Sequence, residues 1–131
     1  MINPSDLDRM VESAIETALW SGTDFDGYTP LDELYDSDDV TDSCRAELIE
    51  DCRGFLETMH EEGLFEVLAG TDYLINNAKD LYGKLGHDFY LTRCGHGAGF
   101  WDRGLGGLGD RLTEISKTFG SFYLDFEESI M

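Results

Sequence analysis

Acidic and apolar residues intermingle in the first half of the chain, and this combination constrains how that half can fold. Residues 1–66 hold 19 Asp and Glu side chains against 3 Lys and Arg, whereas residues 67–131 hold 9 against 6. The densest acidic stretch, 24–51, is interrupted by apolar side chains: Phe25, Tyr28, Leu31, Leu34, Tyr35, Val40, Leu48 and Ile49. Acidic tails that lack such residues are usually disordered. We therefore expect this half to fold and to hold its carboxylates in fixed positions.

Apolar residues at helical spacing predict helices before Gly86. The first is expected over 4–21, and the second over 42–62, where Thr41 or Asp42 caps its start and Gly63 follows its end. A third helix is expected to run to about Leu85, with an interruption near Gly70. Between the first two helices, residues 22–40 are expected to form an irregular loop with a short helical turn around 31–35.

After Gly86 the pattern changes to alternation, which is typical of strands. Residues 87–102 predict a β-hairpin that turns at Gly95-His96-Gly97. Residues 110–119 predict a short helix, and residues 122–126 predict a final strand. We therefore expect an α+β fold, in which N-terminal helices are followed by a small, mostly antiparallel sheet.

Length and composition indicate one compact domain over residues 1–131. The chain has a mass of 14.7 kDa and is 41% apolar, so it can bury a sizeable core without a disulfide or a metal ion. We divide the domain into an acidic helical half, 1–66, and a Gly- and aromatic-rich α+β half, 67–131.

A net charge of −19 argues against two classes of partner. Direct binding to nucleic acid requires a footprint of Lys and Arg residues, and an anionic membrane surface repels so acidic a protein. No stretch approaches the ~20 apolar residues of a membrane-spanning helix. We expect no direct contact with nucleic acid or with a membrane.

The cysteines and the N-terminus indicate the cytoplasm. Cys44 and Cys52 are expected on one helix about 12 Å apart, which is too far for a disulfide. Together with Cys94 they are expected to be free thiols in a reducing compartment. The first residues lack the basic start and the apolar run of a signal peptide.

Three motifs match cofactor or metal sites only in outline. Gly104, Gly106 and Gly109 have the spacing of a dinucleotide-binding turn, but a chain of this length leaves little room for the rest of that fold, so we interpret them as a packing or turn feature. Asp24, Asp26 and Glu33 match part of a calcium-binding loop. His87, Cys94 and His96 combine residue types that bind metal ions or form a nucleophile–base pair. We expect no cofactor and no specific metal site.

The carboxylate array favours binding to a protein partner. A small domain needs a net charge of only ~2–8 for solubility, and excess like charge destabilises the folded state. Carboxylates on neighbouring helical turns lie ~5–6 Å apart, close to the spacing of successive phosphates along a DNA strand. We expect these carboxylates to imitate DNA in the groove of a DNA-binding protein, with contacts from Asp24, Asp26, Asp32, Glu33, Asp36, Asp38, Asp39, Glu47, Glu50 and Asp51.

Three stretches resemble a family of small acidic proteins encoded by tailed bacteriophages. They are ALWSGTD at 18–24, PLD at 30–32 and HDFYLTRCGHGAGFWDRG at 87–104, where the family tends to read ALWSSTD and HDFWLTRNGHGAGFWDRG. The chain departs from that pattern at Gly22, Tyr90 and Cys94. The resemblance implies a phage protein that acts in the host bacterial cytoplasm, and it supplies no catalytic residues.

These observations lead to three functional hypotheses. The first is a non-enzymatic inhibitor, a monomer or homodimer that occupies a restriction or CRISPR nuclease, a repair enzyme or a nucleoid protein as a DNA mimic. The second is a small metal- or nucleotide-binding enzyme or module centred on His96, with a site drawn from His87, Arg93, His96, Phe100, Trp101, Asp102 and Arg103. The third is a minor component of the virion or of its packaging machinery.

Overall fold

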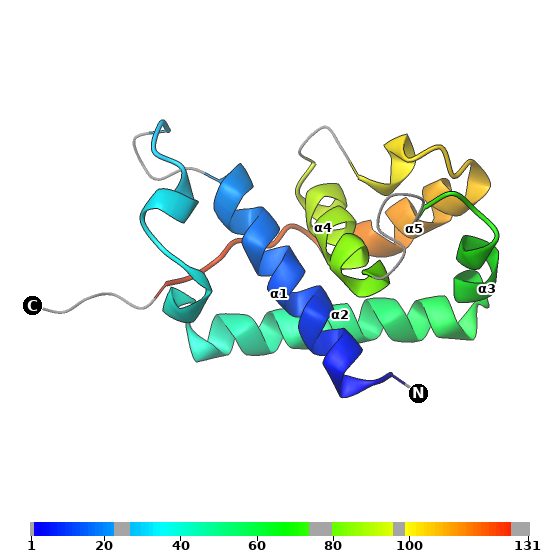
Figure 1. Cartoon of the computed structure of the whole chain (residues 1–131), viewed down its shortest axis with the longest axis horizontal. Coiled ribbons are helices and arrows are strands. Elements are labelled where there is room, and N and C mark those ends of the chain that lie inside the picture. Colours follow the sequence, from blue (N-terminus) through cyan, green and yellow to red (C-terminus); the bar gives the residue numbers. More distant parts are fainter. Residues whose placement is uncertain (1, 23–26, 74–79, 96–98, 127–131) are drawn as a thin grey trace, which may run out of the picture.

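The computed structural model describes residues 2–22, 27–73, 80–95 and 99–126. These residues form helices joined by loops (Figure 1). In chain order the α-helices are α1 (Pro4–Ser21), α2 (Asp42–Glu61), α3 (Leu64–Ala69), α4 (Leu81–Cys94) and α5 (Gly107–Lys117). Short 3₁₀-helices add η1 (Leu31–Glu33), η2 (Ser37–Asp39) and η3 (Phe100–Asp102).

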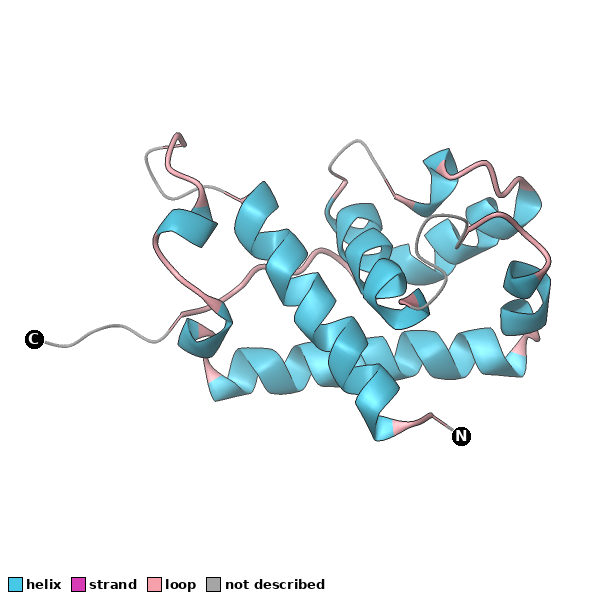
Figure 2. Ribbon diagram, viewed as in Figure 1, coloured by secondary structure: helices cyan, strands magenta, loops and turns pink. Residues whose placement is uncertain are grey.

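The fold is all-α, and the prediction of an α+β fold is wrong. No strand occurs in the described ranges (Figure 2). An isolated antiparallel bridge joins Val40 to Phe126. The described residues of the expected hairpin, 87–102, form the second half of α4 and η3 instead. Within that part of the chain, no helix combines the length and apolar composition needed to cross a bilayer.

The second half of α4 was not predicted as helix, because α4 is buried on nearly every side. The five consecutive residues from Phe89 to Arg93 are all buried, and so are Leu85 and Asp88. A helix that is buried all round shows no single apolar face. A short run of this kind cannot be distinguished from a strand by periodicity alone.

The expected final strand is an extended segment that crosses the start of α2 rather than joining a sheet (Figure 1). The backbone N–H of Thr41 donates to the carbonyl of Asp125 at 2.9 Å. The ring of Phe126 stacks on Tyr35 with centroids 3.9 Å apart. One bridge and one stacked ring pair therefore hold this segment.

The amphipathic helices agree with the sequence. Helix α1 is capped by Asn3, which accepts a hydrogen bond from the N–H of Ser5, and α2 is capped by Thr41, which accepts from the N–H of Cys44. The structure confirms four predicted elements: helices α1, α2 and α5 and the helical turn η1. The expected interruption near Gly70 is confirmed, since α3 ends at Ala69. The expected end near Leu85 is wrong, because α4, which begins after its cap Asp80, runs to Cys94.

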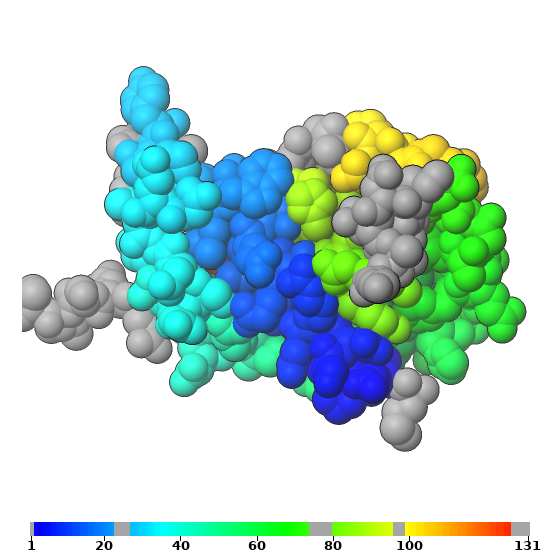
Figure 3. Space-filling model, in the orientation of Figure 1, coloured from blue at the N-terminus to red at the C-terminus, as the bar shows by residue number. Residues whose placement is uncertain are grey.

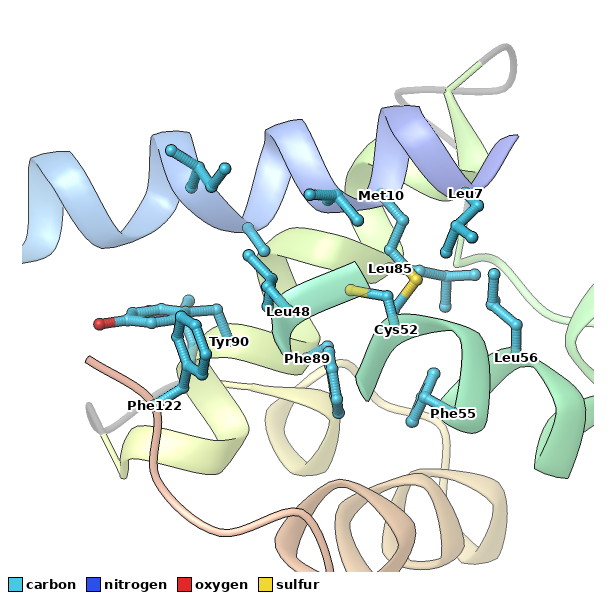
Figure 4. Packing of buried hydrophobic residues seen from close by; sticks show 14 of the residues in the cluster. Leu7, Met10, Leu48, Cys52, Phe55, Leu56, Leu85, Phe89, Tyr90 and Phe122 are labelled. Carbon is cyan, nitrogen blue, oxygen red and sulfur yellow. The ribbon is translucent and has the colours of Figure 1, made fainter. Parts of the chain in front are cut away.

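The core lies where α1, α2 and α4 meet (Figure 4). Phe55 of α2 contacts Phe89 of α4 at a centroid distance of 4.6 Å, and it stacks on Phe100 of η3 at 5.6 Å. All three rings are fully buried. Each such side chain contributes about 1.5–3 kcal/mol by its removal from water, so η3 is fixed to the helices by its aromatic residue.

Helices α1 and α4 pass so closely that one position between them must be glycine. A Cβ added at Gly86 would lie 2.2 Å from the carbonyl oxygen of Met10 and 3.1 Å from the Cβ of Ser13. The nearest obstacle is backbone, which cannot rotate away. Gly86 therefore sets the distance between the two helices that share the most extensive contact among the described elements.

We expect Gly86→Ala to destabilise the fold by about 1–3 kcal/mol, because the added methyl group must push α1 and α4 apart. The measurement is urea unfolding followed by circular dichroism. Gly107→Ala is the matched control, since that glycine lies in α5 with nothing within 4 Å of the added Cβ. The control should be neutral or slightly stabilising. Equal effects at the two positions would contradict this account of the helix contact.

Candidate functional site

All six arginines of the chain bind its own carboxylates. Their partners, in the order Arg9, Arg45, Arg53, Arg93, Arg103 and Arg111, are Asp80, Glu12, Glu50, Asp51, Asp88 and Glu62. Five of these bridges join different helices or a helix and a loop. The chain thus uses its guanidinium groups to hold its own elements together.

Most carboxylates are left without an ionic partner. The described residues include 24 Asp and Glu side chains, of which nine form ion pairs and fifteen do not. Four of the expected partner contacts are exposed, lie outside these pairs and have no side-chain hydrogen bond to a described residue: Asp32, Glu33, Asp38 and Glu47. Two further expected contacts, Asp24 and Asp26, lie outside the described residues.

The other four expected contacts also serve the fold. Asp36 accepts a hydrogen bond from the N–H of Asp38 at 3.0 Å, and Asp39 accepts from the N–H of Asp36 at 2.9 Å, which closes η2. Glu50 pairs with Arg53 at 2.6 Å, and Asp51 pairs with Arg93 at 2.8 Å. Substitution at these positions would change local structure together with charge.

The expected contacts that the structure describes do not form a single flat face. Arg45 and Asp51 are six residues apart on α2, a rotation of roughly 240°, and they bind different neighbours. Arg45 donates to the carbonyl of Ser37 in η2, whereas Asp51 accepts from Arg93. Figure 3 shows the η1–η2 segment projecting at one end of the molecule, beside the start of α2.

Arg93 is a structural residue and not part of an open second site. Its side chain is only 2% exposed. Its Nε donates to the carbonyl of Gly120 at 2.8 Å, and its Nη2 donates to the carbonyl of Phe119 at 3.0 Å. The guanidinium also lies 4.9 Å from the Phe89 ring centroid. These contacts tie the segment after α5 to α4.

The two ends of the sequence block 87–104 are joined by a buried ion pair. Asp88 is fully buried and accepts from Nε and Nη2 of Arg103 at 3.1 and 2.6 Å. The hydroxyl of Tyr73 donates to the other carboxylate oxygen at 2.5 Å. Burial and the nearby Asp88 carboxylate raise the pKa of Tyr73, so its phenol stays protonated as a donor.

The middle of this block is held by tight packing. The N–H of Phe100 donates to the hydroxyl of Thr92 at 3.1 Å. A Cβ at Gly99 would lie 2.2 Å from that hydroxyl oxygen, and the backbone φ of Gly99 is +154°. Phe100 is itself fully buried. The resemblance-bearing block therefore includes a structural clasp around Thr92.

The remaining residues of the expected second site are partly accessible. His87 is half-buried, stacks on the half-exposed ring of Trp20 at 5.9 Å, and shares a 2.9 Å hydrogen bond between its Nδ1 and Thr17. Trp101 is 52% exposed on η3, and Asp102 accepts from the N–H of Gly99 at 3.3 Å. His96 lies outside the described residues.

The metal and nucleotide motifs find no assembled site in the part of the chain that is described. That part contains no group of three or more His, Cys, Asp or Glu residues placed to hold a metal ion. Cys94 lies two turns from His87 and donates to the carbonyl of Phe122. Gly109 packs against η3, where an added Cβ would lie 2.9 Å from the Phe100 carbonyl oxygen. The packing interpretation of that glycine is confirmed.

A cavity between α1 and α4 could not be predicted from the sequence. Its volume is about 380 Å³, and its lining includes Arg9, Asp80, Lys84, His87 and Arg103. These residues come from three distant parts of the chain, so no spacing rule could group them.

Comparison with protein-family models, with curated proteins and with solved structures finds no match for the chain.

We expect Asp88→Asn to destabilise the protein by about 3 kcal/mol, because it leaves Arg103 without its buried counter-charge. Thermal unfolding followed by circular dichroism measures the loss. The control is Glu50→Gln, which removes a carboxylate from an exposed pair with Arg53 and should cost less than about 1 kcal/mol. A smaller loss at Asp88 than at Glu50 would contradict the structural role of the buried pair.

The three thiols should differ sharply in reactivity. All three are free, but Cys44 and Cys52 are buried and Cys94 is partly exposed. Burial raises the pKa of the Cys52 thiol to about 12, so almost no thiolate forms there at pH 8. We expect a thiol reagent to label Cys94 first and Cys52 only after urea unfolding. Peptide mapping identifies the sites, and labelling of native Cys52 as fast as Cys94 would contradict the packing of α2.

Proposed function

We propose that this chain is a phage-encoded, non-enzymatic inhibitor that acts as a DNA mimic in the host bacterial cytoplasm. Its partner would be a host DNA-binding protein of the nuclease, repair or nucleoid class. The observation that carries the proposal is the set of exposed carboxylates without ionic partners, Asp32, Glu33, Asp38 and Glu47, at one end of a folded helical domain. Nothing in the comparisons bears on this function.

The charge balance supports binding to a basic groove. All six guanidinium groups are engaged within the chain, so no arginine is left to neutralise the exposed carboxylates, which repel one another. They do not stabilise the fold, and a net charge of −19 far exceeds what solubility needs. A partner with Lys and Arg side chains arranged for DNA phosphates would relieve this repulsion and associate rapidly.

Apolar side chains at the same end suit a protein partner. Leu34, between η1 and η2, is 47% exposed, and Tyr123 is 78% exposed. Tyr123 lies beside the start of α2, because its carbonyl accepts from the Cys44 thiol. Tyrosine is enriched in protein interfaces, where a buried apolar centre is surrounded by polar contacts. Here Leu34 and Tyr123 would supply the apolar centre, and the surrounding carboxylates would supply the polar contacts.

The alternative centred on His96 has less support. Arg93 and Phe100, which were expected to belong to it, are buried in packing contacts. Arg103 is bound to Asp88. Of that group, the partly accessible residues in the described ranges are His87, Trp101, Asp102 and Arg103, and they do not form a metal-binding cluster.

The proposal predicts that charge, and not shape alone, controls binding. A variant with Asp32→Asn, Glu33→Gln, Asp38→Asn and Glu47→Gln should bind its target about 30-fold more weakly or worse, if each lost contact costs ~0.5 kcal/mol. The target is isolated by capture on immobilised wild-type protein followed by elution with duplex DNA. The affinity of the purified pair is then measured at two salt concentrations, and binding should weaken at the higher one.

The matched control removes four exposed, unpaired carboxylates elsewhere: Glu57→Gln, Glu61→Gln, Glu66→Gln and Asp110→Asn. This variant has the same net charge as the test variant but keeps the η1–η2 end intact. It should retain most of the affinity. If both variants bind alike, or if duplex DNA does not displace the partner, the DNA-mimic proposal is wrong.

A further inference from the structure

The cavity between α1 and α4 is unusual for its charge. Its lining holds three cations, Arg9, Lys84 and Arg103, against one carboxylate, Asp80. Asp88, which binds Arg103 from behind the lining, reduces this excess to one positive charge with His87 neutral. A second cavity, between α2 and Tyr82, carries Arg53 with Glu57 and Glu61. A third carries Arg93 against three carboxylates, Glu47, Glu50 and Asp51. The α1–α4 cavity is thus positive in a strongly negative chain.

Its cationic groups keep donors that the fold does not use. Lys84 has no carboxylate partner in the described ranges, and its ammonium group donates to the carbonyl of Tyr73 and lies 4.4 Å from that ring. Arg103 uses Nε and Nη2 on Asp88. Its Nη1 makes no hydrogen bond to a described residue, so two N–H groups remain for a ligand.

His87 adds a ring nitrogen to the same lining. The single hydroxyl proton of Thr17 is donated to the carbonyl of Ser13 at 2.8 Å. With that bond made, Thr17 accepts from His87, which places the proton of the neutral ring on Nδ1. Nε2 can then donate to a phosphate oxygen only when the ring takes up a second proton. Burial lowers the pKa of His87, with Arg103 and Lys84 acting in the same direction and Asp88 opposing them.

We propose that this cavity binds a dianionic phosphate group, such as that of a phosphate monoester. Lys84 is the cation of the lining that no described carboxylate neutralises, and its ammonium group and the free Nη1 of Arg103 can donate to separate phosphate oxygens. Arg and Lys donors recognise phosphate oxygens by charge-assisted hydrogen bonds. The walls come from two helices and from Arg103, whose position the buried Asp88 fixes. This site is independent of the proposed acidic interface.

The test uses inorganic phosphate as the probe, followed by NMR of the ring of His87 at pH 7.5 and constant ionic strength. Phosphate should cause saturable shifts, and acetate should bind at least tenfold more weakly. Constant salt near 0.15 M limits the repulsion from the distant carboxylates. Shifts that do not saturate, or that acetate reproduces at the same concentrations, would overturn the proposal.

Two further measurements separate binding from folding. Lys84→Gln keeps a donor for the Tyr73 carbonyl but removes the charge, and it should weaken phosphate binding at least fivefold. Lys117→Gln, on the exposed end of α5, should stay within twofold of wild type. In the wild-type protein, saturating phosphate should raise the pKa of His87 relative to chloride at equal ionic strength. Unchanged affinity in Lys84→Gln, or an unchanged pKa, would also overturn the site.

Discussion

The close approach of α1 and α4 at Gly86 determines the arrangement of most of the molecule. With no side chain between the Gly86 backbone and the Met10 carbonyl, α4 can be enclosed and can project buried residues in several directions. Phe89 enters the aromatic core, Asp88 holds Arg103, and Arg93 holds the segment after α5. The same approach places His87 beside Trp20 and forms the walls of the cationic cavity.

The helices that could be predicted are those with one polar and one apolar side. Helices α1, α2 and α5 lie at the surface, so their sequences repeat at the helical period and carry recognisable ends. Helix α4 is central, and it contains Gly83 and Gly86, which have low intrinsic helix propensity. The Asp80 cap is a local signal of its start, but the helical state of this glycine-containing segment depends on tertiary packing, which a local pattern does not carry.

The candidate site could be predicted only in part. The sequence shows which residues are charged, but which charged residues form ion pairs depends on the tertiary structure. The abundance of carboxylates between Leu31 and Asp51 follows from counting. The sequence could not show that Asp51 is bound by Arg93, 42 residues away, or that Glu47 is left alone. Nor could it show that the block 87–104 folds back on itself through Asp88 and Arg103. Both facts depend on where α4 lies.

The two proposed surfaces can act in one small domain because α1 lies between them and covers neither. Glu12 on α1 pairs with Arg45 and accepts from Ser37 at the acidic end, whereas Arg9, less than one turn earlier, pairs with Asp80 at the cavity. Coulomb interactions between exposed charges fall off over about 8 Å at physiological ionic strength. A phosphate in the cavity therefore meets mainly the nearby cations, while a basic partner meets mainly the unpaired carboxylates of the η1–η2 end. Because Arg9 and Glu12 share one helix, a partner that displaced α1 would alter both surfaces together.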